Sequence, residues 1–140
     1  MAVAFTNQAG PSFNSTASAL TYAGAAWTPP NGAVVLAFVI NSKGSGADVP
    51  TSLTTPTLTF TQIATVGFNS AADPTRRITA YRELIGVGVN EAITATFPNN
   101  QTGCALLVIS MTGSVVTGAD AADAIIQAVT DALNKAAEDA

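Results

Sequence analysis

Apolar positions along the chain concentrate in residues 33–40, an uninterrupted apolar run that is rich in β-branched types. Residues 29–32 before it and residues 41–46 after it contain proline, glycine and asparagine, which favour turns. A short apolar run between turn residues predicts a strand that is buried on both faces. Residues 104–111 form a second run of the same kind, and we expect it to lie beside the first.

Several other segments alternate apolar and polar residues, as half-buried strands do. The clearest is residues 92–97, where the pattern directs Ile93, Ala95 and Phe97 inward. In residues 57–68 the alternation slips by one position after Gln62, which predicts a bulge at residues 61–62. Strands are also predicted at residues 3–6, 19–22 and 77–84. Residues 41–56 are predicted to form a long polar connection, and residues 98–103 are predicted to form a turn.

These segments contain no helical pattern before residue 120. Short strands separated by turns, without intervening helices, predict an all-β fold, an antiparallel two-sheet β-sandwich. We therefore expect residues 1–118 to form one β-sandwich domain and residues 119–140 to form a separate C-terminal unit.

The pattern of the C-terminal unit is different. Its apolar residues recur at spacings of four and three, which predicts an amphipathic α-helix with a stripe along one side. This helix could lie on its own sandwich, or it could pack on neighbouring copies or another partner as an inter-subunit seam. A third interpretation makes residues 124–129 a further strand. The candidate interface residues are Ala122, Ile126, Val129, Leu133 and Ala136.

Charge is scarce and unevenly placed. Only 10% of residues are charged, and the formal net charge is −4. The charges before residue 120 cancel, whereas residues 120–140 hold several acidic residues against Lys135 alone. A neutral, threonine-rich body has little charge repulsion to keep copies apart, which favours a protein that packs against something. It carries no basic face for nucleic acid, and no apolar run approaches the length of a membrane span; we expect a soluble chain without an export signal.

The chemistry that the sequence offers is sparse. The chain has no histidine, which removes the usual general base and the commonest transition-metal ligand. Cys104 lies in an apolar run, where a buried inert thiol is the natural interpretation. The acidic residues before residue 120 are expected to stand apart, on loops or on solvent-facing strand positions such as Glu83. We therefore predict no enzymatic activity, no cofactor and no metal site.

The order of segments resembles the jelly-roll-type β-sandwich of bacteriophage structural proteins, and it also resembles modules of secreted bacterial proteins. The likeness lies in residues 27–42, 58–66, 77–97 and 103–113. It implies a scaffold, without functional residues of its own. Together with the neutral body and the spare helix, it predicts a virion structural protein, most simply a phage capsid decoration protein. Its partners would be a major capsid or other virion protein and further copies of itself, in particles assembled in the host cytoplasm.

A second hypothesis is a carbohydrate- or surface-binding module of a tail fibre or secreted protein. Its candidate surface is the connection at residues 41–56 together with Trp27 and Tyr81, whose rings could stack on a sugar. Packing as a lid on the core is the alternative interpretation of Trp27. Exposed aromatic rings would favour the binding module.

Overall fold

The computed structural model describes residues 4–8, 10–70 and 72–113. Every regular element within these ranges is a strand, and the strands form two antiparallel sheets that pack together, as predicted. The predicted helix at residues 119–140 lies outside the described residues. The strands are β1 (Ala4–Asn7), β2 (Phe13–Ser15), β3 (Ala19–Ala23), β4 (Val34–Ser42), β5 (Ser52–Thr54), β6 (Thr61–Phe68), β7 (Arg76–Leu84), β8 (Thr94–Gln101) and β9 (Gly103–Thr112).

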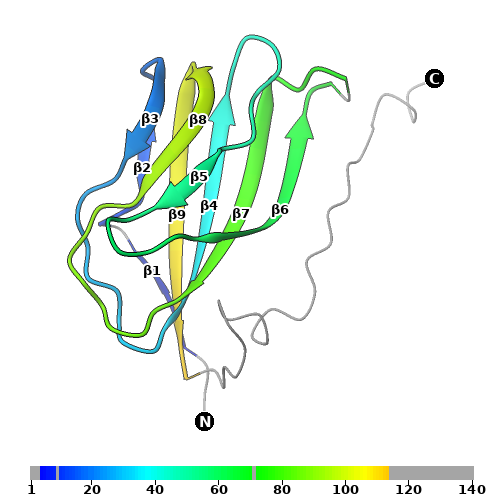
Figure 1. The fold of residues 1–140 in the computed structure, drawn as a ribbon. Coiled ribbons are helices and arrows are strands. Elements are labelled where there is room, and N and C mark those ends of the chain that lie inside the picture. Colours follow the sequence, from blue (N-terminus) through cyan, green and yellow to red (C-terminus); the bar gives the residue numbers. More distant parts are fainter. Residues whose placement is uncertain (1–3, 9, 71, 114–140) are drawn as a thin grey trace.

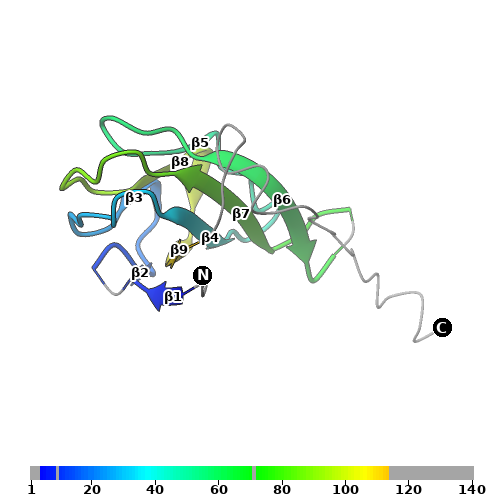
Figure 2. The ribbon, with the colours of Figure 1, turned by 90° about the horizontal axis from the view of Figure 1, so that it is seen from below.

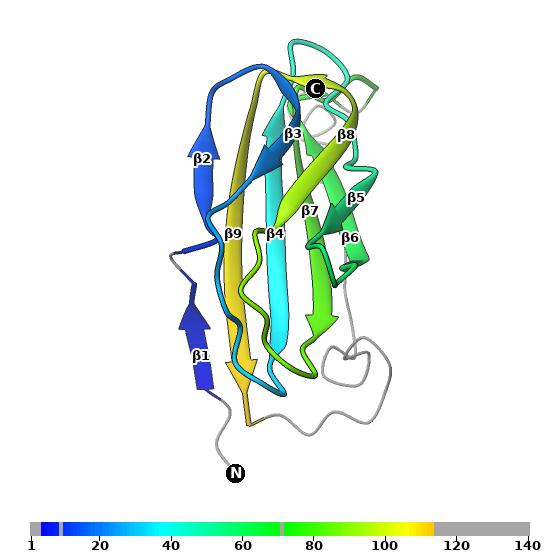
Figure 3. The same ribbon diagram turned by 60° about the vertical axis from the view of Figure 1, so that its left-hand side comes forward.

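The larger sheet, sheet A, has the strand order β1-β9-β4-β7-β6, and β2 pairs with the same edge of β9 as β1 does. The smaller sheet, sheet B, has the order β3-β8-β5 and lies across one face of sheet A (Figure 1, Figure 3). The strand pairs are nested in sequence: each pair encloses the next, from β2–β9 through β3–β8 to β4–β7, with the bridge between Thr54 and Thr59 innermost. The chain can therefore be described as one long antiparallel hairpin that is folded over into two sheets. The predicted pairing of the two apolar runs is confirmed, because β4 lies beside β9.

The hydrophobic core lies between the two sheets. From β4 it takes Val35, Ala37 and Val39, none of which is exposed. From β8 and the residue just before it, the core takes the alternating residues Ile93, Ala95 and Phe97, as the sequence predicts, with exposed fractions of 0%, 0% and 3%. Burying one such aliphatic or aromatic side chain is worth about 1.5–3 kcal/mol, so this layer stabilises the packing of the two sheets.

The prediction that β4 is buried on both faces is correct at its start and wrong at its end. Val34 is fully buried, but Ile40 at the other end of the same face is 38% exposed. On β9, Leu107 is 37% exposed. Both residues alternate with the core-facing positions of their strands, so their side chains point away from sheet B. The ribbon shows sheet B on one side of sheet A (Figure 2). The described strands therefore leave an apolar sheet face partly open to solvent.

Sequence reasoning also misplaced several strand boundaries. It missed β2 and β5, which have three residues each and take their place from cross-strand pairing alone. It placed a turn at residues 98–103, but β8 continues to Gln101. On β8, the residue paired with β3 changes from Thr96 to Gln101 across an irregularity in the pairing. Pro98 lies in the unpaired part of β8 between them, where no backbone N–H is needed for a hydrogen bond to β3. The bulge in β6 lies between Gln62 and Ala64, one residue beyond the predicted position.

Glu83 is the clearest error of orientation. Its side chain was expected to face solvent, but Glu83 is only 8% exposed. In β7 the side chain of Glu83 lies on the same face as those of Thr79 and Tyr81, the face toward sheet B. It pairs with Val35, a core residue of β4. Because the side chain of Tyr81 packs in the core, Thr79 and Glu83, which share its face of β7, must also point inward, and Ile78 must point outward.

Candidate functional site

A buried polar cluster closes the end of the sandwich where β4 and β8 finish. Its centre is Gln101, which is not exposed at all, and Asn41, which is 1% exposed. The side-chain nitrogen of Gln101 donates to the Asp48 carboxylate at 2.6 Å and to the Asn99 carbonyl at 2.9 Å. The side-chain oxygen of Gln101 accepts from Asn41 Nδ2 at 2.8 Å and from the Asp48 backbone N–H at 3.3 Å. Gln101 thus ties the long connection after β4 to the sandwich.

The Asp48 carboxylate accepts hydrogen bonds from several side chains in this arrangement. Burial by itself would raise its pKa, but hydrogen bonds from Lys43 and Gln101 outweigh burial and lower the pKa below its ordinary value. Lys43 Nζ lies 3.1 Å from Asp48 Oδ2, and Asn99 Nδ2 lies 3.5 Å from Oδ1. A low-pKa carboxylate with both oxygens engaged is a poor general base, and its hydrogen bonds join the connection after β4 to the end of β8.

The described residues hold little else that could perform chemistry. Within them, no three His, Cys, Asp or Glu side chains come close enough together to hold a metal ion. The predicted burial of Cys104 is confirmed, since it is 2% exposed, and burial raises the pKa of its thiol to about 12. A thiol of that pKa forms almost no thiolate at neutral pH.

The two rings proposed for carbohydrate binding are buried. Trp27 is 9% exposed and donates from Nε1 to Gln8 Oε1 at 3.0 Å, so the interpretation of Trp27 as a lid on the core is confirmed. Tyr81 is 3% exposed, and burial raises its pKa to about 12. Neither ring offers a free face to a sugar, and the two do not form a common surface.

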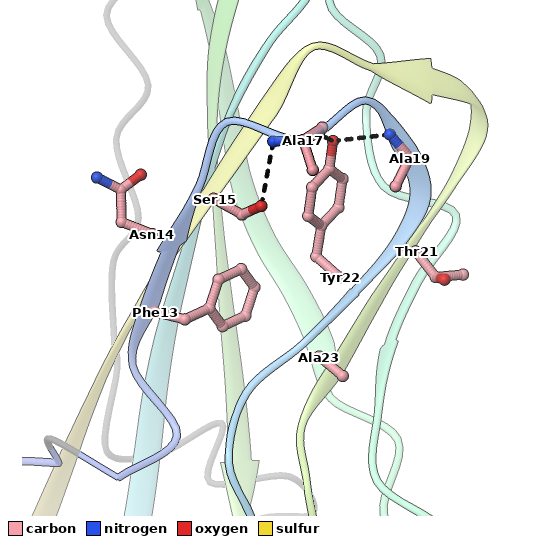
Figure 4. Close-up of a pocket in the computed structure, with 8 residues that line it drawn as sticks. All are labelled: Phe13, Asn14, Ser15, Ala17, Ala19, Thr21, Tyr22 and Ala23. Carbon is pink, nitrogen blue, oxygen red and sulfur yellow. Dashed lines mark hydrogen bonds between the residues drawn. The ribbon is translucent and has the colours of Figure 1, made fainter.

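A shallow pocket of about 380 Å³ opens between β2 and β3 (Figure 4). Phe13 and Tyr22 stack along its wall with ring centroids 6.5 Å apart. The Tyr22 hydroxyl lies 2.7 Å from the Ala17 carbonyl oxygen and 2.9 Å from that of Gln101, which share its single proton, and it accepts from the Ala19 N–H. No charged residue lines the pocket. Its one ionisable group, the tyrosine hydroxyl, is therefore engaged in holding the neighbouring loop.

The outer face of sheet B presents a regular array of small, uncharged side chains. Tyr22, Ala95 and Leu53 pair across the three strands and point into the core. Their neighbours in each strand point outward and form two cross-strand rows. The rows are Thr21–Thr96–Ser52 and Ala23–Thr94–Thr54. None of the strands β3, β5 and β8 contains a charged residue. We call these six residues the hydroxyl face.

The outer face of sheet A has the opposite character. Its register places Leu36, Phe38 and Ile40 of β4 beside Leu107 and Ile109 of β9. Phe68, at the end of β6, is 41% exposed on the same side. The cations on this side are Arg76 and Arg82 of β7. We call this surface the apolar face.

Sequence reasoning found neither face as a surface. The alternation in residues 92–97 does direct Thr94 and Thr96 outward, but their cross-strand partners come from β3 and β5, and β5 gave no signal. The predicted interface residues of the C-terminal segment lie outside the described residues, so the structure does not place them. They are Ala122, Ile126, Val129, Leu133 and Ala136.

Among the described residues, none belongs to a helix with the length and hydropathy needed to cross a lipid bilayer. Comparison of the chain with protein-family models, with curated proteins and with solved structures finds no match.

Proposed function

We propose that this protein is a virion structural protein, and specifically a phage capsid decoration protein that binds the outside of a larger protein assembly. The observation that carries the proposal is the hydroxyl face of sheet B, a regular and uncharged surface built from three strands. The partner would be a major capsid protein or another virion protein. Many copies would bind, in particles assembled in the host cytoplasm.

The physical argument concerns desolvation. Burying a charged side chain at an interface costs several kcal/mol unless it finds a well-placed partner. Small hydroxyl side chains such as Thr21 and Ser52 bury methyl or methylene groups and can satisfy their O–H groups with water or a partner backbone. Each copy would then make modest contacts, and repetition over a lattice would supply the overall affinity.

The strand order supports the same proposal. Pairs of strands nested as β4–β7, β3–β8 and β2–β9 correspond to the winding of a jelly roll, an architecture that viral capsid domains use. The proposed role needs no catalysis and no cofactor, since binding relies on area and multiplicity. The alternative carbohydrate-binding role was based on exposed aromatic rings, and Trp27 and Tyr81 are buried.

The direct test is to quantify the protein by mass spectrometry in purified virus particles produced by cells that encode it. We expect a fixed copy number relative to the major capsid protein. A protein that stays entirely in the particle-free fraction would contradict the proposal.

A matched pair of variants tests the surface. Thr21→Arg places a charge on the hydroxyl face, whereas Thr6→Arg places the same charge on another exposed threonine, in β1 of sheet A. We expect Thr21→Arg to reduce particle occupancy at least about ten-fold, since an unpaired interfacial charge costs more than about 1.4 kcal/mol, and Thr6→Arg to leave occupancy unchanged. Equal occupancy of both variants would rule out the hydroxyl face as the contact.

A further inference from the structure

The apolar face of sheet A is too apolar for a sheet surface that faces water. Phe68, Ile40 and Leu107 are 41%, 38% and 37% exposed there. A sheet with one solvated face normally alternates apolar residues inward with polar residues outward, and β4 does not follow that rule. A contiguous exposed apolar patch of this kind marks a surface that another element covers.

We propose that residues 120–140 of the same chain form an amphipathic α-helix that packs along the apolar face of sheet A. The stripe of Ala122, Ile126, Val129 and Leu133 would face the sheet. This inference does not depend on the proposed function. Of the two interpretations that the sequence leaves open, it selects packing of the stripe on the chain's own sheet over packing on a neighbouring copy.

The first argument is the place where the chain leaves the sheet. β9 ends at Thr112, and Met111 just before it belongs to an apolar cluster with Val34, Leu36 and Leu84, at one end of the apolar face. Gly113 follows with φ of 80°, a left-handed conformation suited to a change of chain direction. Residues 114–119 can span up to roughly 20 Å, which is enough to reverse the chain onto the face beside β9.

The second argument is length. The ten residues of β9 extend about 33 Å at about 3.3 Å per residue, and residues 120–140 as a helix extend about 30 Å at about 1.5 Å per residue. A helix that starts beside Met111 and runs parallel to β4 would bring Val129 level with Phe38 and Leu107. It would bring Leu133 level with Ile40, so the larger stripe residues would meet the exposed apolar residues of β4 and β9.

The third argument is charge. Glu83, the one acidic residue in the described strands of sheet A, points toward sheet B, so the apolar face carries the cations Arg76 and Arg82 without an anion from those strands. Arg82 Nε is buried and has no hydrogen-bond partner among the described residues. The segment 120–140 is acidic and supplies the opposite charge.

One acidic residue of the segment matches a cation in position. In the register that places Val129 over Leu107, Asp123 lies level with Arg82. It lies about 100° around the helix from the stripe, which puts its carboxylate at the side of the helix next to the sheet. A tethered segment reaches an effective concentration in the millimolar range, which favours this occupant over a free partner of similar affinity.

Cysteine cross-linking in the full chain tests the placement. The pair Leu107→Cys and Val129→Cys should be joined by a short bismaleimide within one molecule, at a rate independent of protein concentration. The control pair, Thr21→Cys and Val129→Cys, puts the first cysteine on the hydroxyl face and should react at least about ten-fold more slowly, because the two faces lie on opposite sides of the sandwich. The native Cys104 is buried and can remain.

Each outcome is informative. A cross-linked monomer from the first pair and little product from the control supports the proposal. A cross-linked dimer would show that the segment covers a second copy, and equal rates for both pairs would show that it covers neither face; either result overturns the proposal. The charge register has its own test in the same assay: Arg82→Glu should slow the cross-link, and Asp123→Arg in the same chain should restore it. Without restoration, the register is wrong even if the segment docks.

Discussion

The side chains of Asn41 and Gln101 are joined by a hydrogen bond of 2.8 Å, although 60 residues separate them along the chain. Both are almost completely buried. The bond connects the end of β4 to the end of β8, and therefore connects the two sheets. Asp48 and Asn99 satisfy the remaining polar atoms of Gln101, and Asn41 Nδ2 also donates to the Asp48 carbonyl. Asn41 Oδ1 is buried and has no hydrogen-bond partner among the described residues, which costs part of the stability that such a pair supplies.

Replacing Gln101 should therefore be costly. Gln101→Leu keeps the volume but removes one hydrogen-bond partner from the Asn41 amide and one from the Asp48 carboxylate, and we expect a loss of about 2–4 kcal/mol in the free energy of unfolding. Urea denaturation measures it. Asn100→Leu, at the exposed neighbouring position, should change stability by less than about 0.5 kcal/mol. Similar losses in both variants would mean that the cluster contributes nothing specific.

Asp48 should make stability depend on acid pH. Its folded-state pKa is lower than its ordinary value of 3.8, so the ionised form is stabilised in the folded protein. The contribution is present above about pH 4 and is lost as the pH falls through the folded-state pKa. Asp48→Asn should lower the free energy of unfolding by about 1 kcal/mol at pH 7, a small value because the group is partly solvated.

The measurement is urea unfolding of the wild type and Asp48→Asn at pH 7 and at pH 3. The difference between the two proteins should shrink at pH 3. A difference that stays constant or grows on acidification would contradict the assigned pKa direction.

Two glycines of one turn should respond differently to alanine. A Cβ at Gly88 would collide with the carbonyl oxygen of Pro29, whereas a Cβ at Gly86 meets nothing within 4 Å. We expect Gly88→Ala to lower the free energy of unfolding by about 1–3 kcal/mol, because backbone must move to relieve the clash. Gly86→Ala should be neutral or stabilising by up to about 1 kcal/mol. Thermal or urea unfolding of the two variants compares them, and the opposite order would refute the close packing of this turn against residues 28–29.

Cys104 should resist thiol reagents in the folded protein. It is 2% exposed, and burial raises its pKa to about 12, so both access and ionisation oppose reaction. At pH 8 we expect an aromatic disulfide reagent to modify it only in urea concentrations that unfold the chain. Stoichiometric labelling of the native protein within minutes would show that the strand around Cys104 opens readily.

The part of the fold that could be predicted is the part that depends on local pattern. The alternation of Ile93, Ala95 and Phe97 identifies β8 and its inward side, because the side chains of a strand alternate between its two faces. The apolar runs identify β4 and β9 because only buried strands are so uniformly apolar. The polar cluster was not predicted: Asn41, Asp48 and Gln101 carry no motif, and they meet only because two distant strand ends coincide.

The order of residues alone was enough to predict that the described chain is all-β and to identify the segments that form its central strands. The burial of Trp27 and Tyr81, the inward side chain of Glu83 and the open apolar face of sheet A became known only from the packed fold. This division arises because alternation separates the two faces of a strand without saying which face the second sheet covers. That choice belongs to the pairing register and to the packing of sheets that are assembled from distant parts of the chain.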